Sequence, residues 1–257
     1  MNRVDSLFKR LKRERRCGLI AYVTCGDGDT VRIVEDLERA GADAIELGIP
    51  FSDPIADGPV IQAAAQRALA KGTTTRDVFA IARAIRERSE IPLIAFSYLN
   101  PVLRYGAEAF ARDAKAAGID SLLLTDLPPE SADDFRKGMD LIFLLAPTSP
   151  DARIKIIDKA SDGFVYYVST TGVTGTRNEL DPALLDRLAE VRAKLRHPIA
   201  VGFGISRHEH YAMLRDRCDA IVVGSAIVRA IANGESAGDV VRAILGTSPL
   251  PAARGEG

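Results

Sequence analysis

The sequence predicts a single-domain (β/α)8 barrel, or TIM barrel, with an extra N-terminal helix. Short apolar runs rich in β-branched residues alternate with longer segments of helical periodicity, and eight such runs recur at regular intervals along 257 residues. This alternation indicates parallel strands joined by crossover helices, and about 250 residues is the usual length of such a barrel. An open doubly wound sheet is the competitor, and eight even units without a second domain fit it less well. The expected strands are 19–24, 43–49, 92–98, 120–126, 141–146, 164–169, 198–204 and 220–225.

The chain begins with an expected amphipathic helix over residues 1–16, which should cover the base of the barrel. Its apolar residues fall on one face of a helix, at Val4, Leu7, Phe8 and Leu11. We expect the catalytic domain to span 1–246. The stretch 247–257, which contains proline and glycine and has no helical periodicity, should form a flexible tail.

Composition excludes several classes of protein. Lys plus Arg is 34 against 35 Asp plus Glu, so the net charge of −1 gives no electrostatic signature for nucleic acid or an anionic membrane. No apolar run reaches the roughly 18 residues of a membrane span. The cysteines, Cys17, Cys25 and Cys218, lack metal or redox spacing, and we expect reduced, mostly buried thiols in the cytoplasm.

The second expected strand carries a carboxylate on its inner face. Strand periodicity places Glu46 between Ala44 and Gly48, while the large aliphatic residues face the helices. A carboxylate near the barrel axis is costly unless it is paired. Two interpretations remain open: a general acid/base whose pKa is raised by burial, or a structural Glu that caps an amide or pairs with an arginine.

The loop after this strand adds two aspartates, Asp53 and Asp57. Both stand among prolines and a glycine, where turn chemistry alone explains an aspartate. Asp57 and Glu46 could nevertheless flank one substrate.

Glycines follow the last three strands, where (β/α)8 barrels often hold a phosphate group. Gly204 and the pair Gly224–Ser225 would let backbone N–H groups approach a ligand, and Gly175 would fold over from the sixth loop. The alternative is that these are ordinary turns at strand ends.

The residues needed for nucleotide binding, Schiff-base catalysis or metal binding are not indicated by the sequence. No Gly-rich nucleotide motif is present, and no expected strand contains a lysine for a Schiff base. His208 and His210 fit a solvated helix start better than a metal site, so we expect no metal. Carboxylate acid/base chemistry on a small phosphorylated substrate remains.

Several motifs, in their residues and in their order along the chain, resemble those of the tryptophan synthase alpha subunit family over residues 15–230. These motifs are YVTCGD, ELGIPFSDPIADGP, YLNP, TDLP, VSTTGVTGTR, VGFGIS and GSAIV. The resemblance implies cleavage of indole-3-glycerol phosphate to indole and glyceraldehyde 3-phosphate in tryptophan biosynthesis. It also implies a beta subunit as partner, in an alpha2beta2 heterotetramer, with pyridoxal phosphate in that subunit and no cofactor in this chain.

The resemblance also assigns roles to residues. Glu46 and Asp57 match the catalytic pair, and Gly175, Gly204, Gly224 and Ser225 match positions that contact phosphate. Thr174 matches a lid residue that closes onto the aspartate. The indole pocket is implied to be lined by Tyr22, Phe96, Tyr98, Leu123 and Tyr166.

The chain departs from the family pattern at two positions. Tyr22 stands where the family commonly has Phe, and Gly28 stands where Pro is usual.

Three other functions are alternatives: a stand-alone lyase that releases indole, a non-catalytic barrel that only activates a partner, and another phosphosugar barrel such as an isomerase. The specific stretch 46–59 disfavours the last.

Overall fold

The eight strands form a closed parallel barrel, so the predicted fold class is confirmed. The computed structural model describes residues 2–136, 138–168, 182–202 and 204–247. Each strand pairs with its neighbours in sequence, and β8 pairs with β1 to close the ring. The strands are β1 (Gly18–Thr24), β2 (Ala44–Gly48), β3 (Leu93–Ser97), β4 (Ser121–Leu124), β5 (Asp140–Leu145), β6 (Val165–Val168), β7 (Ile199–Gly202) and β8 (Ala220–Val223).

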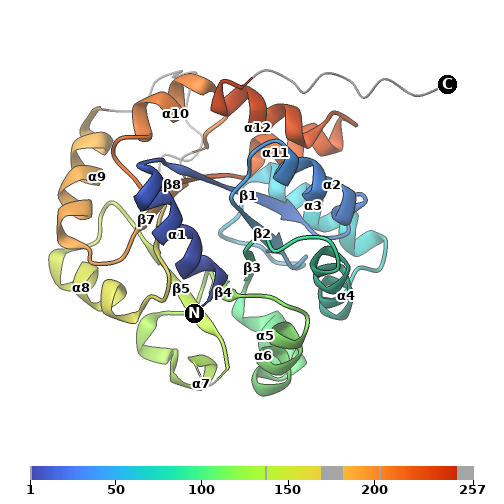
Figure 1. Cartoon of the computed structure of the whole chain (residues 1–257). Coiled ribbons are helices and arrows are strands. Elements are labelled where there is room, and N and C mark those ends of the chain that lie inside the picture. The colour runs from blue at the N-terminus through green and yellow to red at the C-terminus, as the bar shows by residue number, and fades with distance from the viewer. Residues whose placement is uncertain (1, 137, 169–181, 203, 248–257) are drawn as a thin grey trace.

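Helices surround the ring of strands, and α1 (Arg3–Glu14) lies across it (Figure 1). The connection after β3 holds two short helices rather than one, because Gly106 interrupts them with a φ of +93°. The outer elements are α2 (Thr30–Arg39), α3 (Pro59–Ala70), α4 (Thr75–Arg86), α5 (Leu99–Tyr105), α6 (Ala107–Ala116), η1 (Pro129–Ser131), α7 (Asp133–Arg136), α8 (Asp151–Ala160), α9 (Pro182–Lys194), α10 (His208–Leu214), α11 (Ser225–Ala232) and α12 (Ala237–Leu245).

Helix α1 closes the barrel interior at the end where the strands begin. The side chain of Asn2 caps the helix by accepting a hydrogen bond from the Val4 N–H. All four apolar residues of its predicted stripe are buried in the cluster that fills the barrel, where Phe8 packs against Phe164 with ring centroids 5.2 Å apart. The predicted tail lies outside the described residues except for Thr247.

An aspartate before each even-numbered strand holds the N-terminal end of the barrel together. Each carboxylate accepts a hydrogen bond from a backbone N–H of the preceding strand, at 2.8 to 3.0 Å, and also pairs with an arginine. This end is therefore cross-linked by polar contacts, while the opposite rim carries the loops that can form a site. The four pairs are Asp43–Arg16, Asp120–Arg86, Asp162–Arg136 and Asp219–Arg192.

Candidate active site

Glu46 lies inside the barrel with 1% of its surface exposed. Ile45 and Leu47, which flank it, pack on the helix side of the sheet, as the alternation predicts. Among the described residues Glu46 makes no hydrogen bond or ion pair, and its Oε1 atom is buried without a partner. This finding contradicts the interpretation of Glu46 as a structural carboxylate. Burial raises the pKa of Glu46 to about 8, so the group is mostly protonated at pH 7.

Asp57 is held differently, on the loop between β2 and α3. The Tyr98 hydroxyl donates a hydrogen bond to Asp57 Oδ2 at 3.0 Å and accepts one from the Ala56 N–H at 2.9 Å. Gln62 donates to the Asp57 carbonyl oxygen at 2.8 Å and so fixes the backbone. Burial raises the pKa of Asp57 to about 6, although the bond from Tyr98 opposes this shift. Asp57 is therefore mostly ionised at pH 7.

The two carboxyl groups act on the same interior. Burial, followed by the charges of Glu46 and Asp57, raises the pKa of Tyr166, which lies on the inner face of β6. Burial, and after it the charges of Asp57 and Glu46, also raises the pKa of Tyr22 on β1. A neutral acid and an anion thus lie close to the same two tyrosines inside the barrel, which is the arrangement that acid/base chemistry requires.

The residues of the expected indole pocket lie together in this interior. Tyr22 and Phe96 meet edge to face, with ring centroids 5.3 Å apart and an interplanar angle of 81°. Leu123 stands beside Phe96 in the β3–β4 register, and Tyr166 packs against Gly202. Tyr98, directly after β3, contacts Phe51 with ring centroids 5.4 Å apart and a tilt of 37° between the rings. Their role in binding indole stays a prediction.

The two departures from the family pattern have visible consequences. The Tyr22 hydroxyl lies directly over Gly48, where a Cβ atom would come within 2.2 Å of it, and it accepts a hydrogen bond from Thr24 at 3.4 Å. Tyr22 thus adds a polar atom to the pocket that Phe would lack. Gly28 has a φ of +117°, which proline cannot adopt. The loop after β1 therefore has a conformation that excludes proline at this position.

The structure describes three of the four residues predicted to contact phosphate. Gly224 stands directly before α11, and Ser225 is the first residue of that helix, so backbone N–H groups are available there. Gly204 is exposed, has a φ of +65°, and has open space where a Cβ would stand. Gly175 and the lid residue Thr174 lie outside the described residues.

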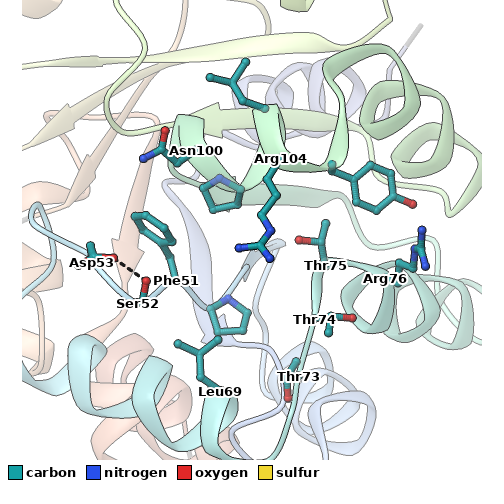
Figure 2. Close-up of a pocket in the computed structure, with 14 residues that line it drawn as sticks. Phe51, Ser52, Asp53, Leu69, Thr73, Thr74, Thr75, Arg76, Asn100 and Arg104 are labelled. Carbon is teal, nitrogen blue, oxygen red and sulfur yellow. Dashed lines mark hydrogen bonds between the residues drawn. The ribbon is translucent and has the colours of Figure 1, made fainter.

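Asp53 lines a cleft to which neither of the two carboxyl groups belongs. Ser52 donates a hydrogen bond to its carboxylate at 2.5 Å, which supports its interpretation as a turn residue. The cleft measures about 1010 Å³ and lies between the loop after β2 and helix α5. Figure 2 shows Arg104 extending into it between Phe51 and Thr75. Neither Glu46 nor Asp57 lines this cleft.

Sequence analysis missed the contacts that position Asp57. Tyr98 was expected only to line a pocket, and Gln62 was not singled out. Tyr98 had a usable signal, since β3 adjoins β2 in any such barrel and its C-terminal end reaches the same rim. In the described part of the chain, no group of three or more metal-ligating side chains is suited to a metal ion, and no helix combines the length and apolarity needed to cross a bilayer.

Comparisons with known proteins agree with one another. The family model "Tryptophan synthase alpha chain" matches residues 8–247. The tryptophan synthase alpha chain of Solibacter usitatus is 54% identical over 246 residues, which cover 92% of each chain. A structure of the alpha chain from Legionella pneumophila superposes with a TM-score of 0.86 at 36% identity, covering 95% of this chain and 96% of that one. A structure from Pyrococcus furiosus, reported for the mutual activation of its tryptophan synthase a2b2 complex, gives 0.84 at 41% identity, covering 89% and 98%. The chain therefore belongs to the tryptophan synthase alpha chain family.

Proposed function

We propose that this chain, through a catalytic domain spanning 1–246, cleaves indole-3-glycerol phosphate to indole and glyceraldehyde 3-phosphate by a retro-aldol reaction. Family membership supports the reaction. The contrast between the two carboxyl groups is the observation that carries the residue assignment. With pKa values of about 8 for Glu46 and about 6 for Asp57, one group holds a proton at pH 7 and the other does not.

The proposed steps use both protonation states. Glu46 gives its proton to C3 of the indole ring, which leaves the ring nitrogen positively charged. The ionised Asp57 accepts a hydrogen bond from the ring N–H and stabilises that charge. Glu46, now a carboxylate, takes the proton of the side-chain hydroxyl as the carbon–carbon bond breaks. Indole and the aldehyde form, and Glu46 ends protonated as it began.

Tyr98 is assigned the task of holding Asp57 in its ionised form and orientation. We expect Tyr98→Phe to raise the pKa of Asp57, because the hydroxyl that favours the carboxylate is lost. The acidic limb of the profile of kcat/KM against pH should then move to higher pH. If the acidic limb did not move, Tyr98 would not control the ionisation of the catalytic aspartate, even if KM changed.

The phosphate group is assigned to the start of α11, with Gly204, Gly224, Ser225 and, outside the described residues, Gly175. Ser225→Asp should weaken glyceraldehyde 3-phosphate binding at least about tenfold and indole binding far less, because a carboxylate at the first residue of α11 repels the phosphate group. A helix N-terminus tolerates an aspartate, so the variant should fold. Calorimetry with both ligands checks this, and equal weakening of the two would count against the assignment.

The outer cleft is our proposed docking surface for the beta subunit. Its lining residue Leu103 is 53% exposed, and Ile55, on the adjoining loop, is 87% exposed. Exposed apolar side chains around a cleft are typical of an interface. This surface includes the loop that carries Asp57, so docking would further restrain the loop on which Tyr98 and Gln62 already hold the catalytic aspartate. In this proposal the assembly is an alpha2beta2 heterotetramer in the cytoplasm, and pyridoxal phosphate belongs to the beta subunit.

Leu103→Asp tests this surface. A buried, unpaired charge disfavours docking, so we expect activation by a beta subunit to fall at least tenfold while the chain's own turnover is unchanged. Ile156→Asp on α8 is the matched control, since Ile156 is 44% exposed and outside the cleft. If both variants are activated alike, the docking surface lies elsewhere.

The whole proposal is tested by measuring indole release from indole-3-glycerol phosphate with and without a beta subunit. We expect slow release by the chain alone and a large increase with the partner. Equal rates would favour a stand-alone lyase. Absence of turnover in both conditions would favour a barrel that only activates its partner.

A further inference from the structure

Two of the three thiols meet at the end of the barrel opposite the proposed active site. Cys17 directly precedes β1, and Cys218 lies two residues before β8. Their Sγ atoms are 3.7 Å apart, although the residues are 201 positions apart in sequence. Cys25, at the other end of β1, is fully buried and is not part of this pair.

The barrel seam holds the two thiols in place. Gly18 pairs with Ala220 in the β1–β8 register, and the Gly18 N–H donates to the Asp219 carbonyl oxygen at 2.9 Å. The Tyr211 hydroxyl donates to the carbonyl oxygen of Cys17 at 3.3 Å. A disulfide needs its sulfur atoms about 2.05 Å apart. The two sulfur atoms must therefore approach by about 1.7 Å for the bond to form.

A cavity of about 230 Å³ reaches both thiols, and its lining is strongly basic. The lining holds six basic side chains and two acidic ones. Arg16, Arg192 and Arg215 pair with carboxylates, so the excess positive charge comes from the other three basic residues. A cavity lined by one sign of charge concentrates small ions of the other sign. The basic residues are Lys12, Arg15, Arg16, Arg192, Arg215 and Arg217.

We propose that Cys17 and Cys218 form a redox-active dithiol that small anionic disulfides, such as oxidised glutathione, convert into an intramolecular disulfide. One thiol loses its proton and attacks a sulfur of the reagent, which forms a mixed disulfide and releases one thiolate. The second thiol loses its proton and attacks the protein sulfur of that mixed disulfide, releasing the second thiolate. The protein gives up two electrons, and one reagent disulfide becomes two thiols.

This disulfide would lock the first strand to the last across the seam that closes the barrel. A link between residues so distant in sequence removes much conformational freedom from the unfolded chain. The thiols are more than nine-tenths buried, and the hydrogen bond with Cys17, together with burial, raises the pKa of Cys218. Oxidation is therefore slow, because little thiolate is present.

The experiment treats the full-length protein with oxidised glutathione and maps the products by mass spectrometry of non-reduced peptides. We expect one intramolecular link between the Cys17 and Cys218 peptides, loss of two titratable thiols, and a Tm raised by about 5 °C or more. Dithiothreitol should reverse all three changes.

Single substitutions sharpen the test. Cys218→Ser leaves Cys17 alone and should stop at the mixed disulfide with glutathione, whereas Cys25→Ser, the matched control, should form the same link as the unaltered protein. The proposal is overturned if no link forms, if the link joins two molecules, or if it includes Cys25. None of these readouts depends on lyase activity, so they stand apart from the proposed function.

Discussion

Glu46→Gln is expected to lower kcat for indole-3-glycerol phosphate cleavage by at least about 10²–10⁴-fold, the usual contribution of a general acid/base. Glutamine has nearly the same shape but cannot give and take a proton. KM should change little, because Glu46 acts on bonds that break rather than on the phosphate or the ring faces. Steady-state indole release by the chain alone measures both constants.

Asp53→Asn is the matched control for this loss. Asp53 is a carboxylate near the same rim, but it is exposed and lines the outer cleft. Its variant should keep the turnover that the chain shows without a partner. If Glu46→Gln retained more than about a tenth of the unaltered rate, Glu46 would not be the proton donor.

Glu46→Gln should also stabilise the fold at alkaline pH. Glu46 has a pKa of about 8 in the folded protein against 4.5 as its ordinary value, so the folded state holds its proton more tightly. Stability therefore falls as pH rises from about 4.5 to about 8 and stays reduced above that range. Glutamine has no proton to lose. The variant's gain in free energy of unfolding should grow by about 4 kcal/mol between about pH 5 and about pH 9.

Urea unfolding of both proteins at the two pH values measures this gain. Near pH 5 the two proteins should differ by only about 1 kcal/mol, because this pH lies just above the ordinary pKa of the carboxyl group, 4.5. A difference that stayed the same at both pH values would mean that the buried carboxyl group does not titrate as the structure indicates.

Much of the scaffold and part of the site follow from sequence patterns. Eight apolar runs separated by helical segments predict the barrel, because a parallel strand pair needs a crossover connection. The period of two within β2 also predicts which way Glu46 faces, since Ile45 and Leu47 must cover the helices. The orientation of a strand residue is a local property, and local patterns are sufficient for it.

Contacts between distant segments could not be predicted in the same way. The Tyr98–Asp57 hydrogen bond depends on how the loop after β2 folds back over the end of β3. The approach of Cys17 to Cys218 depends on the register between the first and last strands. Register is set by packing across the whole ring, which no short stretch of sequence encodes.

The pH dependence of kcat/KM tests the central claim most directly, because it reports the ionisations of the free enzyme. A neutral Glu46 and an ionised Asp57 are both required. We therefore expect a bell-shaped profile with an acidic limb near pH 6 and an alkaline limb near pH 8. In the Glu46→Gln variant the alkaline limb should be absent from whatever activity remains. A profile for the unaltered protein that is flat from pH 5 to pH 9, or that rises through pH 8, would contradict the account.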